Sequence, residues 1–304
     1  MVREKVVIFG VAGFIGRNLA EYLRDKYQVI GSDIVEPSSK YMDVFIKADI
    51  TNYHQVLNVV RGSDYIAHFA AHALSPSLTD PITNAMINII GTLNILQAAL
   101  TNGIRKILFT SASSVIGETT SSIVSENVLP KPKSPYAVTK LSCEHYFRIY
   151  GELWNVNYVV FRLFNVYGPY QKSGLIPNLY TKIVRDEPVE ITGDGKQIRD
   201  FIYVKDAIKF FEEALKRDDC SKLLVNLGTG RGVKIIDVAN ILFKLLNKTP
   251  RILFIPRQKT EISNFVADTK LLKEKFGFLP ETPLEVGIAE TINWLKNETN
   301  SKIE

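Results

Sequence analysis

The stretch VVIFGVAGFIG, residues 6–16, decides how this sequence folds. A strand-length apolar run ends at Gly10, and Gly13 and Gly16 follow as a segment with helical periodicity begins. Glycines at a strand-to-helix turn let the backbone approach a pyrophosphate, which the free N–H groups and the positive dipole end of the helix then stabilise. The spacing G-x-x-G-x-x-G, although it differs from G-x-G-x-x-G, therefore predicts a phosphate-binding turn.

An acidic residue twenty positions after Gly13 favours this prediction over the alternative that the glycines merely end a strand. Asp33 closes the second apolar run, YQVIGSD, where a carboxylate accepts hydrogen bonds from the adenosine ribose and repels a 2′-phosphate. We therefore predict NAD rather than NADP as the cofactor. Asp49 follows the next apolar segment, and two roles stay open for it: contact with the adenine, or a cap for the following helix.

Apolar runs of strand length alternate with segments of helical period along the first half of the chain. The runs are continuously apolar, as a parallel sheet buried on both faces requires, and lie at residues 5–10, 27–33, 64–71, 106–112 and 156–164. Repeated β-α-β units predict an α/β fold with a doubly wound parallel sheet, the Rossmann fold.

The rhythm changes after residue 165, where shorter, mixed elements are separated by prolines. We therefore expect a dinucleotide-binding domain over residues 1–165 and a smaller C-terminal α/β substrate lobe over residues 166–304. The apolar segment 222–228 is a candidate to return to the first sheet.

The composition narrows the class of protein. The chain of 304 residues carries a net charge of +5 with its basic residues scattered, so nucleic acid is not a predicted partner. The two cysteines, Cys143 and Cys220, lie far apart without a C-x-x-C pair, so neither a disulfide framework nor a metal site is expected. The sequence shows no apolar leader and no apolar run of about 18 residues. We expect a cytoplasmic protein without a membrane segment.

The segment SPYAVTKLS, residues 134–142, places Tyr136 and Lys140 one helical turn apart. A tyrosine hydroxyl has a pKa near ~10, which a neighbouring ammonium and the positive nicotinamide lower, so that the phenolate can act as a base. The alternative is an ordinary packed helix face with an amphipathic lysine. Position favours catalysis, because the helix follows TSASSVIG at the carboxyl edge of the sheet, where ligands bind in such folds. His68 and Cys143, by contrast, are expected to be packed residues.

With these segments the sequence resembles the extended short-chain dehydrogenase/reductase family, and within it the NAD-dependent nucleotide-sugar epimerases and dehydratases, UDP-glucose 4-epimerase most of all. The resemblance covers nearly the whole chain. It rests on these segments, each given with its first residue: GVAGFIG at Gly10, HFAA at His68, NIIGTLNIL at Asn88, SPYAVTK at Ser134, FRLFNVYGP at Phe161, RDFIYVKD at Arg199 and VADTKLL at Val266. The resemblance implies a nucleotide-sugar 4-epimerase that binds NAD and a nucleotide-diphosphate sugar.

The resemblance also implies the site residues. Those that would bind NAD are Gly10, Gly13, Phe14, Ile15, Gly16, Asp33, Asp49, Ile50, Phe69, Ala70, Ala71, Asn88, Ser111, Tyr136, Lys140 and Phe164. Those that would contact the substrate are Asn165, Ile176, Arg199, Arg257 and Gln258. The catalytic candidates are Tyr136 and Lys140, with Ser111 and Ser113. From the residues alone, Arg199 could instead form a surface ion pair with Asp200, and Asn165 could be a turn residue.

The resemblance further implies a homodimer. Its interface would be a four-helix arrangement of the helices near residues 82–102 and 134–151 from each subunit. The apolar residues expected there are Ile87, Leu93, Leu96, Leu141, Phe147 and Ile149.

Two regions depart from the family pattern. Ala112 stands three residues before Val115, where the family carries a serine or threonine, and strand alternation turns the flanking Ser111 and Ser113 to the opposite face. Ile116 replaces the following tyrosine. Further along, Gln258 occupies the position of an arginine that binds the diphosphate, with Arg257 one residue early.

These departures keep other functions open. A 4,6-dehydratase is disfavoured because Ser113 and Ser114 stand where its acidic pair would be. A nucleotide-sugar reductase or decarboxylase is disfavoured because Asp33 opposes NADPH. A non-catalytic NAD-binding regulator fits Ala112 and Ile116, whereas the presence of both Tyr136 and Lys140 argues against it.

Overall fold

The computed structural model of the chain describes residues 3–119, 121–256 and 264–300. Contacts divide the chain into two compact units. Unit 1 comprises Met1–Glu118, Glu126–Leu163 and Ile208–Asn226, and unit 2 comprises Thr119–Ser125, Phe164–Ala207 and Leu227–Glu304. One observed boundary thus lies beside the expected one at residue 165. Both units are nevertheless discontinuous in sequence, because 119–125 belongs to unit 2 and 208–226 to unit 1.

Unit 1 is built on a seven-stranded sheet with the order β11-β7-β5-β4-β1-β2-β3. The strands are β1 (Lys5–Phe9), β2 (Gln28–Asp33), β3 (Val44–Lys47), β4 (Tyr65–His68), β5 (Lys106–Ala112), β7 (Tyr158–Leu163) and β11 (Leu223–Leu227). β1 pairs in parallel with both β2 and β4, and β5 pairs in parallel with both β4 and β7. The doubly wound sheet is therefore confirmed, and β11 returns to it as an edge strand beside β7.

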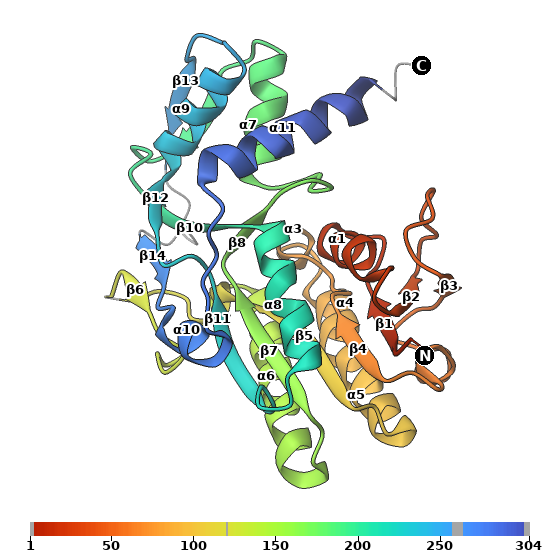
Figure 1. Ribbon diagram of the computed structural model, residues 1–304. Coiled ribbons are helices and arrows are strands. Elements are labelled where there is room, and N and C mark those ends of the chain that lie inside the picture. Colours follow the sequence, from red (N-terminus) through yellow and green to blue (C-terminus); the bar gives the residue numbers. More distant parts are fainter. Residues whose placement is uncertain (1–2, 120, 257–263, 301–304) are drawn as a thin grey trace. The chain divides into compact units, whose positions relative to one another are not determined.

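Helices cover both faces of this sheet because its strands are apolar on both sides (Figure 1). The helices of unit 1 are α1 (Phe14–Leu23), α2 (Tyr53–Val60), α3 (Leu74–Ser77), α4 (Pro81–Ala85), α5 (Gly91–Asn102), α6 (Pro135–Trp154) and most of α8 (Val204–Lys216). Phe109 of β5 packs in one cluster with residues of α2, α5 and α6, and its ring stacks on Phe147 of α6. Phe161 of β7 contacts Phe211 of α8.

The helix α6 begins and ends at residues whose local chemistry sets its limits. Ser134 is its N-cap and accepts a hydrogen bond from the backbone N–H of Ala137, and Pro135 occupies the first turn. Asn155 closes the helix in the left-handed conformation. These local signals place Tyr136 in the first turn and Lys140 in the second.

One helical stretch, Pro81–Asn102, is long and apolar enough to cross a membrane by composition alone. It consists of α4, a π-helical turn at Met86–Ile90 and α5. Ile95 and Leu96 of α5 lie in the core of unit 1 with 0% exposure, so the apolar character of the stretch is explained by packing on the sheet.

Unit 2 carries a mixed five-stranded sheet with the order β12-β10-β14-β6, in which β8 also pairs with β10. The strands are β6 (Ile123–Val124), β8 (Asn165–Tyr167), β10 (Ile198–Tyr203), β12 (Gly232–Lys234) and β14 (Asn264–Ala267). A separate parallel pair joins β9 (Val189–Thr192) and β13 (Ile252–Ile255). The helices are α7 (Leu175–Val184), α9 (Ile235–Leu245), α10 (Lys270–Phe276) and α11 (Leu284–Asn300). The expected C-terminal α/β lobe is thus present.

Candidate active site

The glycine turn between β1 and α1 is shaped by close backbone approach. Gly10 has φ +82°, and a Cβ placed on it would lie 2.5 Å from the backbone nitrogen of Ala70. A Cβ on Gly16 would lie 2.2 Å from the carbonyl oxygen of Gly10. Gly13 is the N-cap of α1 and brings no capping side chain to the first turn. The turn therefore presents a helix N-terminus behind a backbone surface without side chains, as a diphosphate requires.

Asp33 lies at the carboxyl end of β2 and holds this turn in place. Its carboxylate accepts hydrogen bonds from the backbone N–H groups of Ala12, at 3.0 Å, and Ile34, at 2.8 Å. Tyr41 adds a second tie, since its hydroxyl donates to the carbonyl oxygen of Val11. Sequence reasoning placed Asp33 at the ribose but missed that the same carboxylate orders the glycine turn.

The structure excludes one of the two roles left open for Asp49. Its carboxylate accepts from the backbone N–H and the hydroxyl of Thr51, whereas the cap of α2 is Asn52, which accepts from the N–H of Gln55. The helix-cap interpretation of Asp49 is therefore wrong. Ile50 is 6% exposed and packs in the core of unit 1.

Asn88 lies in the π-helical turn and uses its side chain within the protein. Its amide oxygen accepts from the backbone N–H of His72 at 2.7 Å, and its amide nitrogen donates to Thr139 at 2.9 Å. Asn84 joins the same network through His72 and Thr139. The side chain predicted to contact NAD thus ties the segment after β4, which includes Ala70 and Ala71, to α6.

Tyr136 and Lys140 lie on one face of α6, but the lysine is not directed at the tyrosine hydroxyl. Lys140 is 3% exposed, and its ammonium group donates to the carbonyl oxygen of Thr110 at 2.8 Å. Its nitrogen lies 4.6 Å from the ring centre of Phe109 and 5.7 Å from that of Tyr136. Burial raises the pKa of Tyr136 to about 12 and lowers the pKa of Lys140 to about 8. The helical spacing of Tyr136 and Lys140 led us to expect a lowered tyrosine pKa. The chain without its cofactor does not lower it.

Ser111 points toward α6, but its hydroxyl is engaged there by Glu144. Ser111 is 2% exposed, its hydroxyl donates to Glu144 at 2.6 Å, and Glu144 is paired with Arg162. The prediction of Ser111 as a catalytic and NAD-binding side chain is corrected accordingly: strand alternation turns it into the α6 interface. Ala112 is extended and ends β5, and Ser113 opens a single 3₁₀ turn, Ser113–Val115.

The packed residues His68 and Cys143 lie beneath this face of α6. His68 is 1% exposed, and its Nε2 lies 3.0 Å from the hydroxyl of Thr92. Cys143 is fully buried, and its thiol donates to the carbonyl oxygen of Asn88. Burial, and after it the charge of Lys140, hold the pKa of His68 well below its usual range, so this imidazole is neutral.

The predicted substrate residues belong to unit 2. Asn165 lies on β8 and donates to the carbonyl oxygen of Asp200 at 3.0 Å, so it joins β8 to β10 and is not a turn residue. Arg199 lies on β10 and donates to the carbonyl oxygen of Ile198. Ile176 is 2% exposed within the core. Arg257 and Gln258 lie outside the described residues.

Asp200 is a structural centre of unit 2 that sequence reasoning did not find. The residue is 0% exposed, and its carboxylate accepts from the N–H and hydroxyl of Thr229, the N–H of Gly230 and the N–H of Ala267. The alternative that Arg199 forms a surface ion pair with Asp200 is therefore wrong. Phe164, also in unit 2, stacks on Phe265.

Comparison with known proteins decides the family. The sequence matches the NAD dependent epimerase/dehydratase family over residues 6–228, which include the glycine turn, Asp33, Tyr136, Lys140 and Arg199. The chain belongs to this family. Its identification as an extended short-chain dehydrogenase/reductase is confirmed, and it is an NAD-dependent nucleotide-sugar epimerase/dehydratase.

Three relatives show how widely the reactions of such proteins range. UDP-glucose 4-epimerase of Thermotoga maritima, crystallised with UDP-glucose, is 28% identical with a TM-score of 0.91 over 97% of this chain and 99% of that one. UDP-glucuronic acid 4-epimerase of Bacillus cereus, in complex with UDP-glucuronic acid and NAD, is 30% identical with a TM-score of 0.89 over 97% and 99%. UDP-N-acetyl-alpha-D-glucosaminuronate decarboxylase of Bacillus cytotoxicus is 29% identical over 98% of this chain and 100% of its own length.

NAD is the cofactor of this protein, and the residues of unit 1 fit NAD. The cradle at Gly10 and Gly16 is the observation that tests the fit, because a side chain at either position would collide with backbone. The glycine turn would hold the diphosphate, and Asp33 the adenosine ribose. Tyr136 and Lys140 stand near the carboxyl end of β5, the sheet edge at which ligands bind in this fold.

Proposed function

We propose that this chain is a nucleotide-sugar 4-epimerase of the UDP-glucose/UDP-galactose type. The observation that carries the proposal is the arrangement of α6, with Tyr136 in its first turn and Lys140 bound to the Thr110 carbonyl of β5. A base and a cation held at the carboxyl end of a doubly wound sheet suit the removal of a proton from a sugar hydroxyl. Similarity to 4-epimerases acting on UDP-sugars supports the same reaction.

The residues divide the reaction between them. Tyr136 removes the proton from the 4-hydroxyl of the sugar and returns it to the oxygen after the keto sugar has turned. NAD, when bound, would supply the nicotinamide that takes up the hydride from C4 and later returns it. The sugar therefore undergoes no net oxidation. Lys140 holds a buried positive charge on the same helix face, and a positive charge stabilises the phenolate form of Tyr136.

Two observations favour a second function, that of a non-catalytic NAD-binding regulator. Ala112 supplies no hydroxyl at the end of β5, and burial raises the pKa of Tyr136 to about 12. Both features suit a protein that binds NAD without turnover. The presence of Lys140 together with Tyr136 favours the enzyme. A 4,6-dehydratase receives less support, because Ser113 and Ser114 offer no acid to expel a hydroxyl.

The test is direct. The purified chain, incubated with UDP-glucose, should form UDP-galactose without added reductant, and Tyr136→Phe should abolish the conversion. Denaturation of the protein should release NAD. Retained NAD with no conversion of UDP-glucose, UDP-glucuronic acid or their N-acetylated analogues would instead support the non-catalytic function.

The substrate diphosphate requires an anchor, and we infer that Arg199 provides it. A guanidinium fork matches the geometry of a diphosphate, and the Arg199 side chain lies on a strand whose neighbour, β8, carries Asn165. The main-chain carbonyl of Asp200 accepts from Asn165 of β8, and its buried carboxylate ties β10 to Thr229 and to Ala267 of β14. Replacement of Arg199 by Gln should weaken UDP binding more than NAD binding.

We also infer a cytoplasmic homodimer. Both cysteines are free and buried, as suits a reducing compartment. Ile82, Met86 and Ile90 form a stripe of side chains that are 76%, 49% and 39% exposed, and Val138 of the adjacent helix α6 is 48% exposed. Such a stripe is suited to a two-fold interface.

The residues first expected at that interface need correction. Leu96 and Phe147 are 0% exposed and belong to the core of unit 1, because they point toward the sheet. Ile87 and Leu93 pack partly against the same core. The exposed residues Ile82, Met86, Ile90 and Val138 take their place in the proposal.

A further inference from the structure

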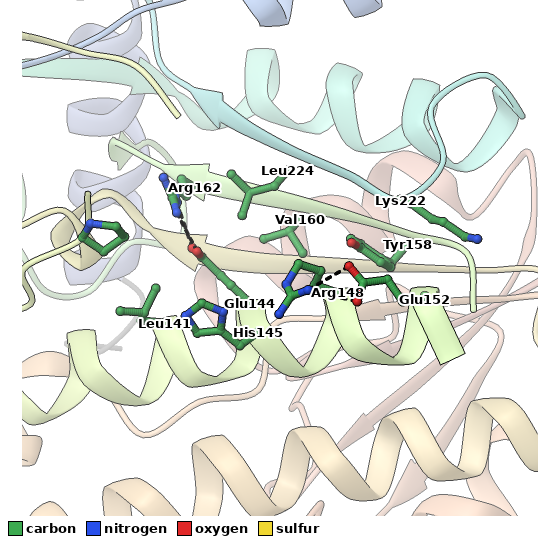
Figure 2. Close-up of a pocket in the computed structure, with 12 residues that line it drawn as sticks. Leu141, Glu144, His145, Arg148, Glu152, Tyr158, Val160, Arg162, Lys222 and Leu224 are labelled. Carbon is green, nitrogen blue, oxygen red and sulfur yellow. Dashed lines mark hydrogen bonds and ion pairs between the residues drawn. The ribbon is translucent and has the colours of Figure 1, made fainter. Parts of the chain in front are cut away.

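A buried ion pair joins the catalytic helix to the sheet. Arg162 of β7 donates from Nε to Glu144 Oε1 at 2.9 Å and from Nη2 to Oε2 at 2.7 Å, and both side chains are about 5% exposed or less (Figure 2). Ser111 of β5 donates to the same Oε1 at 2.6 Å. Arg162 Nη1 donates to the carbonyl oxygen of Glu126. The Glu144 carboxylate is thereby fixed by three donors from two strands.

This carboxylate lies on the same face of α6 as the catalytic pair. Tyr136, Lys140 and Glu144 are spaced four residues apart, so they follow one another along one side of the helix. Lys140 binds the carbonyl of Thr110, and Glu144 binds the hydroxyl of the next residue, Ser111. Two successive turns of the helix are therefore attached to two successive residues of β5.

Packing alone does not require an ion pair here. Phe147 already buries α6 against Phe109 of β5. Replacement of a buried ion pair by apolar residues of similar volume is often neutral or stabilising, because desolvation of the two charges offsets their attraction. Apolar contacts are not directional, so they allow the helix to slide along the sheet. A bidentate ion pair fixes the helix in one position.

We propose that Glu144 is a positioning residue: held by Ser111 and Arg162, it fixes the register of α6 on β5 and so places Lys140 and Tyr136 for the reaction. The inference rests on the function proposed above. It assigns no contact between Glu144 and substrate or cofactor.

The charge of Glu144 also acts on Lys140. The titratable groups around the Lys140 ammonium are Tyr136, Cys143 and Glu144 on its own helix and His68 on β4, while Arg162 of β7 faces Glu144. Burial lowers the pKa of Lys140 to about 8, and electrostatic interaction with Cys143 and with the Glu144 carboxylate opposes that lowering. Loss of the Glu144 charge should therefore lower the pKa of Lys140 further.

The same helix offers a matched control. Glu152 accepts two hydrogen bonds from Arg148, as Glu144 does from Arg162, but the Glu152 and Arg148 side chains are 57% and 56% exposed (Figure 2). Glu144→Gln and Glu152→Gln are thus the same substitution on the same helix. Only the first breaks an attachment to β5.

The experiment measures turnover, thermal stability and the titration of Lys140. Glu144→Gln should lower kcat roughly ten- to a hundredfold with KM for the UDP-sugar nearly unchanged, as misplacement of a reacting group does. Ser111→Ala, which leaves the ion pair intact but removes one donor to the carboxylate, should lower both kcat and the melting temperature by less than Glu144→Gln does. Glu152→Gln should match the wild type in each measurement.

Two further measurements separate positioning from stability. The double variant Glu144→Leu with Arg162→Met should regain the melting temperature but not kcat. In NMR spectra with ¹³C-labelled lysine, the Lys140 signal, assigned with Lys140→Arg, should titrate at a lower pH in Glu144→Gln than in the wild type or Glu152→Gln.

The outcomes are distinct. Recovery of kcat together with the melting temperature in the double variant would show that the pair is only structural and would overturn the proposal. An unchanged Lys140 titration in Glu144→Gln with unchanged kcat would do the same. If the wild type converted no UDP-sugar, the proposed 4-epimerase function would fail, and the lysine titration would still decide whether Glu144 positions Lys140.

Discussion

The ammonium group of Lys140 donates a 2.8 Å hydrogen bond to the main-chain carbonyl of Thr110. The bond fixes a buried cation on β5 and leaves the Tyr136 ring at 5.7 Å from the nitrogen. In the chain alone, burial raises the pKa of Tyr136 to about 12. The role proposed for Tyr136 as a base therefore requires positive charge brought by the cofactor, in addition to Lys140.

The burial of Lys140 predicts a specific pH dependence of stability. Its pKa is about 8 in the folded chain against 10.5 as the ordinary value, so between these two pH values the unfolded chain binds more protons and stability rises with pH. Below about pH 8 the folded chain bears the full cost of burying the charged lysine, about 3 kcal/mol. Lys140→Met removes this cost, so its stability advantage over the wild type should be larger at pH 7 than at pH 10. Urea unfolding of both proteins without NAD measures it, and a pH-independent difference would contradict the buried-lysine account.

Asp33 should set the preference for NAD. Asp33→Ser removes the carboxylate that holds Ala12 and that we propose binds the ribose, so NAD affinity should fall roughly tenfold or more while NADP gains relative to NAD. Asp33→Asn keeps the size and loses the charge, which separates repulsion of the 2′-phosphate from the loss of the turn contact. Titration calorimetry compares the two cofactors. Tighter binding of NADP than NAD by the unmodified chain would show the assignment to be wrong.

Gly16 should tolerate no side chain. A Cβ there would lie 2.2 Å from the carbonyl oxygen of Gly10, and backbone cannot yield cheaply, so Gly16→Ala should lose about 1–3 kcal/mol of stability and most NAD affinity. The matched control is Gly103→Ala, where φ is +63° but nothing lies within 4 Å. It should cost about 1–2 kcal/mol and leave NAD binding intact. Equal NAD affinity in both variants would argue against a phosphate cradle at this turn.

Ala112 should limit the rate. A charge-assisted hydrogen bond to the reacting oxygen is worth roughly 1.5–3 kcal/mol, so Ala112→Ser or Ala112→Thr should raise kcat about ten- to a hundredfold with NAD affinity nearly unchanged. Ser111 cannot supply this bond, since its hydroxyl is held by Glu144. Steady-state rates with the best UDP-sugar provide the measurement. Slower turnover in both variants would mean that another group or a water already serves the oxygen.

The exposed stripe on α4 and the π-helical turn should mediate dimerisation. Ile82→Glu with Met86→Glu places two charges in the proposed interface, so the mass measured by light scattering at micromolar concentration should fall to that of a monomer. Leu129→Glu, at a residue 74% exposed elsewhere on unit 1, should leave the dimer unchanged. A monomeric wild type would refute the interface.

The sequence by itself determined the features that depend on neighbouring residues. The glycine turn, Asp33 at the end of β2 and the start of α6 at Ser134 each rest on signals within a few residues or within one β-α-β unit. Helical spacing likewise put Tyr136 and Lys140 on one face. Such local geometry follows from backbone periods that hold wherever the segment lies in the fold.

Only the tertiary structure decided how distant segments use their polar groups. Ser111, Glu144 and Arg162 come from three elements, and Asp200 gathers donors from Thr229 and Ala267. Lys140 is directed to Thr110 rather than to Tyr136 for the same reason. Which strands lie side by side fixes these partners, and strand order comes from packing of the whole chain, which a hydrophobic period of two or 3.6 residues does not encode.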